Sequence, residues 1–414
     1  MTDTEKDKIF ARLRREAGGS VDYMVREITR ICRDMEPRSP GTRGEREAGV
    51  YMAEVLRKDC GCPRVQIESF REQPGAFYGY LHFSTALDLL CCLCFFFSPG
   101  LCLLFGAAAF ALMLLQFILY HRVVDPFFPT REGTNVTALR PCTGEVRRRV
   151  FFNGHIDAAW EWPLNYHLGG VAFEAHVVLA TLGVFCYMGL AVCRLAGAGV
   201  WVRTAGWICL LFLPAWIGLP FLRNRRRVVD GANDDLSGCY MGIALLRAME
   251  QAGLALEHTE VGVLLTGSEE SGLRGAKAWC RAHREDYRDV PTYIYSFDTI
   301  HDPRYLMVNF RDLNGTVKAD AAMGELFLRS AAEQDVPCRR GWVPPLGGAT
   351  DSAAFCQGGF RAVAVTGLNH KLEDYYHTRR DSYDNLDRTG LENCYRATVR
   401  LLEELDRGAL DREV

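Results

Sequence analysis

The sequence predicts an α/β protein in which a mostly parallel, mixed sheet is flanked by helices and four transmembrane helices are inserted as two hairpins. Three observations lead to this prediction. The polar parts of the chain alternate between strand and helix patterns, four long apolar runs interrupt them, and acidic and histidine residues follow the expected strands. A chain of 414 residues is long enough for one large α/β domain with insertions.

The apolar runs come in two pairs. Residues 79–97 and 101–120 form the first pair, and residues 171–193 and about 205–222 form the second. A helix that spans a bilayer needs ~20 mostly apolar residues, whereas an apolar run of about 10–14 residues is more typical of a buried core helix. The length of the runs therefore favours two transmembrane hairpins over core helices of a soluble protein.

A hairpin enters and leaves on the same side of the membrane, so all polar segments share one compartment. We expect residues 1–78, 121–170 and 223–414 to form one discontinuous soluble domain, and residues 79–120 and 171–222 to form the hairpins. The arginines that flank the spans on this shared side are Arg122, Arg131, Arg223, Arg225, Arg226 and Arg227, whereas the opposite turns carry only Arg194, with Arg203 nearby. The positive-inside rule thus predicts a multi-pass integral membrane protein with its soluble domain in the cytoplasm.

Two formal glycosylation sequons favour the opposite orientation. They begin at Asn135 and Asn314, and they would matter if the soluble domain faced a secretory lumen. The cysteines argue against that orientation. Many of the 16 cysteines lie in the apolar runs and the others form no C-x-x-C pairs, which fits a reducing compartment better than a disulfide framework. The N-terminus also lacks the apolar region of a cleavable signal peptide.

Three ionisable residues, Asp88, Glu174 and His176, lie inside the expected spans. A charge near the middle of a span is costly unless it has a partner or access to water. We therefore expect Asp88 either to pair with a residue such as His176 or Arg203 or to face a water-filled crevice between the hairpins. A structural pair is the simpler of these interpretations.

Overall charge excludes one class of partner. The net charge is -3 with 24% charged residues, and the arginines cluster locally instead of covering one face. Nucleic acid is therefore not an expected partner, whereas the lipid bilayer is. No feature of the sequence indicates an oligomeric state.

Strands and helices alternate through the polar segments. Apolar runs bounded by polar turns predict strands, and apolar residues at helical spacing predict helices. The expected strands are residues 149–157, 259–267, 292–300 and 361–367, and the expected helices are residues 236–253, 273–283 and 392–410. In such sheets, binding sites form at the carboxyl ends of the strands.

Potential metal ligands stand at these strand ends. His155 and Asp157 follow the first strand, Glu269 and Glu270 follow the second, and Asp298 lies in the third. Asp234 begins the helix that follows the fourth apolar run, and His377 lies in "DYYHTRRD". Taken singly, each has an ordinary structural explanation, such as a turn, a helix cap or a solvated surface charge. Together, carboxylates and imidazoles at consecutive strand ends are the donors of a hydrolytic zinc site.

The order of the motifs resembles that of metallopeptidase family 28. The motifs are H-x-D at 155–157, N-D-D-x-S-G at 233–238, E-E-x-G-x-x-G at 269–275, F-D at 297–298 and Y-H-T-x-x-D at 376–381. The segments "EPRSPGTRGEREAGVYMAEVL" and "GGATDSAAF" are also similar to segments of that family. The likeness covers all soluble segments and neither hairpin. It implies an α/β exopeptidase with two zinc ions, acting on peptides.

The resemblance also implies roles for individual residues. One zinc would be held by His155 and Asp298 and the other by Glu270 and His377, with Asp234 bridging both. Glu269 would be the general base, and Tyr376 would donate a hydrogen bond to the oxyanion. Asp157 would accept the second N–H of the His155 ring, and Asp235 would be either a further supporting residue or a helix cap.

Several functions remain open for such a site. The simplest is a membrane-anchored zinc aminopeptidase, and a carboxypeptidase or dipeptidase of the same fold is the nearest alternative. A non-catalytic scaffold would be expected to have lost ligands, and a single-zinc glutaminyl cyclase does not need the full set of five. Ala158 and the Thr350-Asp351-Ser352 triplet depart from the family pattern, which leaves the substrate unassigned.

Overall fold

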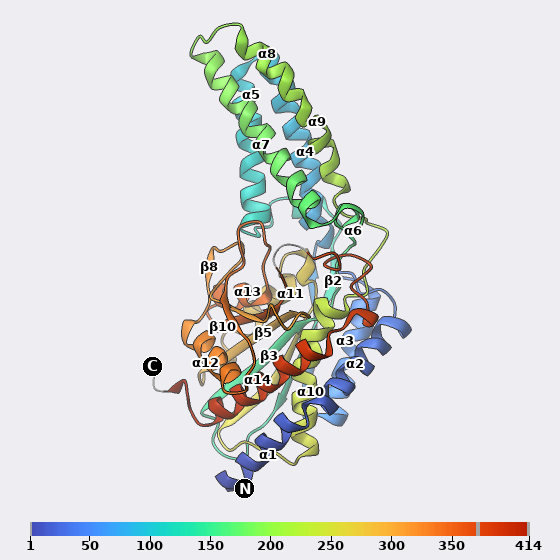
Figure 1. Cartoon of the computed structure of the whole chain (residues 1–414), viewed down its shortest axis with the longest axis vertical. Helices are drawn as coiled ribbons and strands as arrows, with labels where there is room; N and C mark the ends of the chain where they lie inside the picture. The colour runs from blue at the N-terminus through green and yellow to red at the C-terminus, as the bar shows by residue number, and fades with distance from the viewer. Residues whose placement is uncertain (1, 370–372, 412–414) are drawn as a thin grey trace.

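A mixed eight-stranded sheet forms the centre of the soluble body, as expected from the sequence (Figure 1). The computed structural model describes residues 2–369 and 373–411. In spatial order the strands are β1 (Arg64–Glu72), β2 (Arg131–Arg140), β4 (Thr259–Thr266), β3 (Arg148–His155), β5 (Thr292–Ile300), β10 (Arg361–Gly367), β6 (Met307–Asn309) and β9 (Arg339–Gly341). A separate small sheet pairs β7 (Arg311–Asp312) with β8 (Val317–Lys318).

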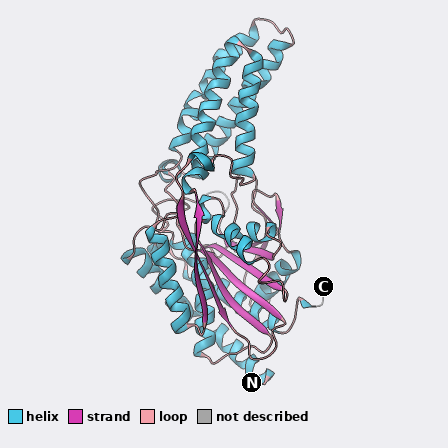
Figure 2. Ribbon diagram, turned by 180° about the vertical axis from the view of Figure 1, so that it is seen from behind, coloured by secondary structure: helices cyan, strands magenta, loops and turns pink. Residues whose placement is uncertain are grey.

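The four central strands β4, β3, β5 and β10 run parallel to one another. Strand β2 pairs antiparallel with both β1 and β4, and β6 pairs antiparallel with β10. Because the central strands are parallel, their carboxyl ends lie along one edge of the sheet. That edge faces the helical bundle that projects from the body in Figure 2.

Helices cover both faces of the sheet. Val150 and Phe152 of β3 point into one hydrophobic core, whereas Phe151 points into another on the opposite face. The first core is closed by α1 (Asp3–Arg15), α2 (Ala17–Asp34), α3 (Arg43–Asp59), α10 (Ser237–Gln251), α12 (Ala321–Ala332) and α14 (Arg388–Asp406). The second core is closed by α11 (Arg274–His283) and α13 (Asp351–Gln357). This alternation is the period-two pattern of a strand buried on both faces.

Four helical segments in the described part of the chain are long and apolar enough to cross a membrane: Pro74–Phe97, Pro99–Ile118, Gly170–Leu195 and Trp201–Phe221. They comprise α4 (Pro74–Phe97), α5 (Pro99–Met113) with the short π-helix η1 (Leu114–Ile118), α7 (Gly170–Leu195), and a fourth segment built from α8 (Trp201–Ile208), η3 (Cys209–Phe212), α9 (Leu213–Gly218) and η4 (Leu219–Phe221). The short helix α6 (Pro163–Leu168) leads into α7.

The bundle has a core of its own and an apolar exterior. Phe95, Tyr187 and Trp216 are fully buried between the helices. Large apolar side chains such as Leu104 and Leu211 are exposed on the outside. An apolar surface of this extent is what a helix bundle presents to lipid.

The fourth segment differs from the expected run in two respects. It begins at Trp201, earlier than the expected 205, and it is not one continuous α-helix. Pro214 and Pro220 lie at the first turns of α9 and η4. Proline lacks an N–H and is accommodated at the start of a helix, so each one divides the segment into shorter helices.

The expected pairing of Asp88 inside the bundle is wrong. Among the described residues, Asp88 has no hydrogen bond or ion pair with His176, Arg203 or any other group, although only 4% of its surface is exposed. Asp88 instead lines a partly open cavity between the helices, and a crevice between the hairpins was the alternative that the sequence left open.

The first hairpin is fastened to the soluble body where its second helix ends. The side-chain amide of Asn314 donates to the carbonyl oxygens of Phe117 and Ile118 at 3.1 Å each. Just beyond, Arg274 of α11 makes two hydrogen bonds to the Asp125 carboxylate, at 2.6 and 2.8 Å, and both side chains are buried. These contacts hold the end of the hairpin beside the turn that follows β4.

The asparagines of the two sequons lie inside the fold. Asn135 and Asn314 are both buried, and the amide groups of both side chains are hydrogen-bonded within the fold. Neither side chain is accessible for glycosylation in the folded chain. All 16 cysteines are free in the structure.

Candidate metal centre

The expected ligands converge at the carboxyl ends of the central strands. His155 is the last residue of β3, Asp298 lies near the end of the neighbouring β5, and Glu269 and Glu270 follow β4 in the short helix η6 (Glu269–Ser271). His155, Glu269 and Glu270 are buried and Asp298 is partly buried. Adjacent parallel strands thus bring together residues that are more than a hundred positions apart in the chain.

Asp234 lies between the two histidines. It belongs to η5 (Ala232–Leu236), the turn that precedes α10. Its Oδ1 lies 3.1 Å from His155 Nε2, and its Oδ2 lies 3.0 Å from His377 Nε2. One carboxylate therefore faces an imidazole with each of its oxygens, which is the arrangement required of a ligand shared by two metal ions.

Two groups of potential ligands meet at Asp234. The first group is His155, Asp234 and Asp298, and the second is Asp234, Glu270 and His377. Within each group, the potential ligand atoms lie within 4.8 Å of one another. His377 Nε2 is also 3.0 Å from Glu270 Oε1. Nitrogen and carboxylate oxygen donors at this spacing fit zinc, because zinc accepts both kinds of ligand.

The electrostatics of the cluster favour bound cations. Burial raises the pKa of Asp298 to about 7, and the nearby Asp234 carboxylate adds to this effect. Burial opposes a charge on His377, but the Glu270 and Asp234 carboxylates outweigh burial and raise its pKa to about 10. The pKa of Asp234 is lowered despite burial, because both histidines donate to it. Three carboxylates share a buried site with two imidazoles, and divalent cations would offset their charge.

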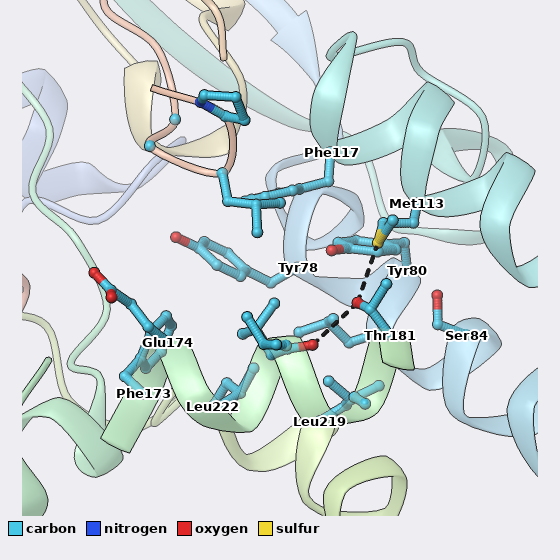
Figure 3. A pocket seen from close by; sticks show the side chains of 18 of the residues that line it. Tyr78, Tyr80, Ser84, Met113, Phe117, Phe173, Glu174, Thr181, Leu219 and Leu222 are labelled. Carbon is cyan, nitrogen blue, oxygen red and sulfur yellow. Dashed lines mark hydrogen bonds between the residues drawn. The ribbon is translucent and has the colours of Figure 1, made fainter. Parts of the chain in front are cut away.

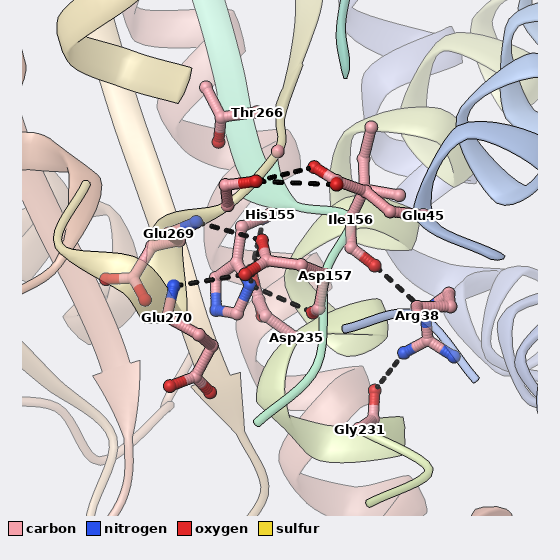
Figure 4. Close-up of polar contacts among 12 residues, drawn as sticks. Arg38, Glu45, His155, Ile156, Asp157, Gly231, Asp235, Thr266, Glu269 and Glu270 are labelled. Atoms are coloured by element: carbon pink, nitrogen blue, oxygen red, sulfur yellow. Dashed lines mark hydrogen bonds and ion pairs between the residues drawn. The ribbon is translucent and has the colours of Figure 1, made fainter. Parts of the chain in front are cut away.

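Asp157 holds the turn that carries the glutamate pair. Its Oδ1 accepts from the main-chain N–H of Glu269 at 3.0 Å, and its Oδ2 accepts from that of Glu270 at 3.1 Å (Figure 4). The expected contact with the His155 ring is present as well, since Nδ1 lies 3.2 Å from the main-chain oxygen and 3.4 Å from the Oδ1 of Asp157. The hydrogen bonds to the glutamate amides were not anticipated from the sequence.

Asp235 supports His155 from the main chain. Its Oδ2 accepts from the His155 N–H at 2.9 Å, and its Oδ1 accepts from the Gly238 N–H at the start of α10, also at 2.9 Å. Asp235 is fully buried. Its two hydrogen bonds combine the two roles that the sequence left open, support of a potential ligand and a helix cap.

Three further residues position the cluster and were missed by sequence reasoning. Asp381 accepts from the main-chain N–H groups of Asn233 and Asp234 at 2.8 and 3.2 Å. Arg38 donates to the carbonyl oxygens of Ile156 and Gly231, as Figure 4 shows, so it ties the strand that carries His155 to the turn that carries Asp234. The Trp162 ring packs edge-on against His377, with centroids 4.4 Å apart. Asp381 ends the Y-H-T-x-x-D motif, which was the one available signal.

Glu269 and Tyr376 lie beside the cluster and line the same cavity as Glu270 and His377. Burial raises the pKa of Glu269 well above its usual range, and the neighbouring Glu270 carboxylate adds to the effect. The Tyr376 ring stacks on the His377 ring with centroids 4.1 Å apart, and burial raises the pKa of its hydroxyl. The first residue can exchange a proton in the cavity, and the second can donate a hydrogen bond there.

Comparison with solved structures identifies the class of fold. A zinc aminopeptidase from Bacillus subtilis is 12% identical, with a TM-score of 0.56 and coverage of 93% of this chain and 95% of that one. The LapA aminopeptidase of Legionella pneumophila is also 12% identical, with a TM-score of 0.53 and coverage of 96% and 74%. A glutaminyl cyclase from Fimbriiglobus ruber is 14% identical, with a TM-score of 0.54 and coverage of 92% and 94%. At this identity the likeness shows a shared fold, that of the zinc aminopeptidases.

Comparison of the sequence with protein families adds one match. Residues 220–402 match the model of Peptidase family M28. The matched segment contains Asp234, Glu269, Glu270, Asp298 and His377, and it excludes His155. No curated protein matches the chain significantly.

Replacing Asp157 tests its role in holding the glutamate turn. In Asp157→Ala the amides of Glu269 and Glu270 lose their acceptor, so zinc affinity should fall about 10–100-fold, as is usual when support of a metal ligand is removed. Competition with a chelator of known affinity measures the change. The matched control is Asp230→Ala, which removes a nearby carboxylate outside the cluster and should bind zinc like the wild type. Equal affinities of the two variants would rule out this role.

Zinc binding should weaken as the pH falls. Without bound metal, the pKa of His377 is raised from 6.5 to about 10, so the ring is protonated at neutral pH. A metal ion must displace that proton, and the apparent affinity should therefore rise with pH until it levels near the raised pKa. Calorimetry in buffers of different ionisation enthalpy would detect the released proton. Binding at pH 7 without proton release would contradict this assignment of His377.

Proposed function

We propose that the protein is a member of Peptidase family M28 and a membrane-anchored, zinc-dependent hydrolase of peptide-type amide bonds, most simply an aminopeptidase. The observation that carries the proposal is the placement of Asp234 between two groups of ligands, each with one histidine and one further carboxylate. The match of residues 220–402 and the shared fold of zinc aminopeptidases support the same reaction class.

The ligands for two zinc ions would be His155, Asp298 and the shared Asp234 on one side, and Glu270, His377 and Asp234 on the other. Zinc bound there would supply Lewis acidity, which lowers the pKa of water and polarises a scissile carbonyl. Asp157 and Asp235 hold these side chains in place through the main chain.

Glu269 is the residue proposed to move protons. It is adjacent to a ligand but belongs to neither group of ligands, and it lines the cavity. Because burial raises its pKa, the carboxylate can accept a proton from the attacking water and deliver it to the leaving amine. In the balanced reaction the amide C–N bond breaks, a C–O bond forms, and the products are a carboxylate and an amine.

Tyr376 is the residue proposed to stabilise the oxyanion. Its ring is fixed between His377, on which it stacks, and Trp162, which packs edge-on at 5.8 Å. A hydroxyl held beside the ligands can donate to the oxygen on which charge develops, and such a donor acts without reorganisation.

Other functions of the same fold are less well supported. A carboxypeptidase or dipeptidase would use the same residues, and the choice depends on which end of the substrate must be free. A glutaminyl cyclase is represented among similar structures, but the five-ligand set here provides for two metal ions. A non-catalytic scaffold has no need of the complete set or of Glu269.

Replacing the proton-transfer residue tests the mechanism. Glu269→Gln should lower kcat about 10²–10⁴-fold, since general acid–base catalysis contributes that much. Bound zinc, measured by atomic emission, should stay unchanged, because Glu269 is not a ligand.

Tyr376→Phe should lower kcat as well, by ~10² or more, as expected for loss of an oxyanion donor. The substrates are leucine amide and its N-blocked form, acetyl-leucine amide. An aminopeptidase should cleave only the first, because it requires a free amino group. Full activity of Glu269→Gln would refute the mechanism.

We further propose that the soluble body lies on the cytoplasmic side, on the evidence of the arginines flanking the spans. A reporter fused after Val414 that is active only in the cytoplasm should be active, whereas one active only outside it should be silent. The reverse result would place the site on the other side of the membrane and would leave its chemistry unaffected.

A further inference from the structure

A cavity of about 440 Å³ runs from the candidate metal centre into the helical bundle. At its base it is lined by Glu269, Glu270, Tyr376 and His377. Above them its walls come from helices α4, α5 and α7, with Leu219 from the end of the fourth segment and Leu222 just after it (Figure 3). The volume is typical of a binding site for a small molecule. Most of this site lies in the part of the chain that is apolar enough to be in the membrane.

The cavity is long and follows the helices. On α4 its lining extends from Phe77 to Asp88, and on α7 it extends from Phe173 to Phe185. At a rise of 1.5 Å per residue, these stretches correspond to about 16 Å and 18 Å along the helix axes. A side chain of one amino acid is much shorter than this space, so a natural occupant has an extended chain.

The upper walls suit a hydrocarbon better than a peptide. Tyr80, Leu81, Ala109, Met113 and Val184 contribute apolar surface. Among the polar residues there, the Thr181 hydroxyl already donates to the Val177 carbonyl oxygen at 3.0 Å. An extended peptide would have an N–H and a C=O at every residue with few partners in these walls, which is costly in an apolar environment. A hydrocarbon chain has no such groups.

Two polar side chains lie at the far end of the cavity. Ser84 and Asp88 are one turn apart on α4, and they are 6% and 4% exposed. The Ser84 hydroxyl has no hydrogen-bond partner, and Asp88 has neither a hydrogen bond nor an ion pair among the described residues. A hydrocarbon that reached Asp88 would bury an unpaired carboxyl group, so this end limits the length of the chain.

The wall between α5 and α7 also faces outward. Phe110 and Phe185 line the cavity, yet they are 39% and 45% exposed on the outside of the bundle. Their rings contact each other edge-on at 5.3 Å. Two aromatic side chains thus separate the cavity from the surface that lipid would cover, and a chain dissolved in the bilayer could enter between them.

We infer that the substrate is an amide whose acyl group is a long hydrocarbon chain, and that this chain lies in the bundle while the amide reaches the metal centre. The inference rests on the proposed hydrolysis of an amide bond, but not on the aminopeptidase specificity. Water adds to the amide carbonyl and the C–N bond breaks, which gives a long-chain carboxylate and a free amine. The amine, with its polar substituents, faces the soluble body.

A matched pair of substitutions on α5 tests the inference. Ala109 is buried against the cavity, whereas Ala107 is exposed on the outside of the same helix and does not line the cavity. Ala109→Phe would fill the upper part of the cavity, and Ala107→Phe adds the same side chain to the outer surface. Both variants are compared with the wild type as full-length, zinc-loaded protein in phosphatidylcholine nanodiscs, so partition of the substrate into lipid is the same for all three.

The substrates are acetyl, octanoyl, dodecanoyl and hexadecanoyl amides of glycine. For Ala109→Phe, the ratio of kcat/KM for the dodecanoyl to the acetyl compound should fall at least about tenfold, because loss of even one methylene-sized contact changes specificity by that factor. Ala107→Phe should keep the wild-type ratio. Asp88→Leu should raise the relative rate on the hexadecanoyl compound. Equal chain-length profiles for Ala109→Phe and Ala107→Phe, or a wild type that prefers the acetyl compound, would overturn the inference.

A binding measurement separates this inference from the proposed reaction. Dodecanoyl hydroxamate combines the hydrocarbon chain with a zinc-chelating group, and its binding does not require turnover. It should bind Ala109→Phe at least about tenfold more weakly than Ala107→Phe. If no amide is cleaved but this difference is found, the proposed hydrolysis fails and the cavity assignment stands. If amides such as leucine amide are cleaved and the difference is absent, the hydrolysis stands and the cavity assignment fails.

Discussion

The contact of one carboxylate, Asp234, with two histidines is the interaction on which the rest of the site depends. Each oxygen of Asp234 faces the Nε2 of one histidine, at 3.1 Å for His155 and 3.0 Å for His377. Asp298 and Glu270 add two further buried or partly buried carboxylates. Negative charges so close together in the interior repel one another and are expensive to desolvate. Cations stabilise such a cluster, and two imidazolium rings or two bound zinc ions would supply them.

The second apolar hairpin and the candidate site are connected by hydrogen bonds. The second hairpin is inserted between Asp157 and Asp234 in the sequence. Trp162 and Asn165 lie just before this hairpin. The main-chain N–H of Trp162 donates to the carbonyl oxygen of His377 at 2.8 Å, and the buried side-chain amide of Asn165 donates to the carbonyl oxygen of Tyr376 at 2.8 Å. The segment that leads to the hairpin therefore holds the loop that carries one histidine. This explains in physical terms why an insertion between two parts of the cluster need not disturb it.

The sequence was most informative where one strong pattern decides the structure. Two buried strands, at 259–266 and 292–300, were anticipated nearly to their ends, and the four apolar helical segments were anticipated to within about five residues of theirs. Continuous apolar runs of those lengths have few alternatives. Of the five proposed ligands, His155, Glu270 and Asp298 lie at or near the ends of strands, which is the pattern that pointed to them in the sequence. The N-terminal helices and the antiparallel β1 and β2 were not assigned in advance.

Other features depend on tertiary contacts that a linear pattern does not contain. Asp381 and Arg38 act on main-chain groups, and any polar residue at those positions would look alike in the sequence. Asp88 was expected to pair inside the bundle, but the side chains around it leave a cavity instead. The cavity is lined both by residues of the bundle and by Glu269 and His377, and a linear pattern does not contain that continuity.

The central claim is that this chain binds two metal ions on either side of Asp234. Anomalous scattering at the zinc edge, from crystals of the zinc-loaded protein, tests it directly. Two peaks are predicted, one contacted by His155, Asp298 and Asp234 and the other by Glu270, His377 and Asp234. A single peak, or peaks away from Asp234, would contradict the account.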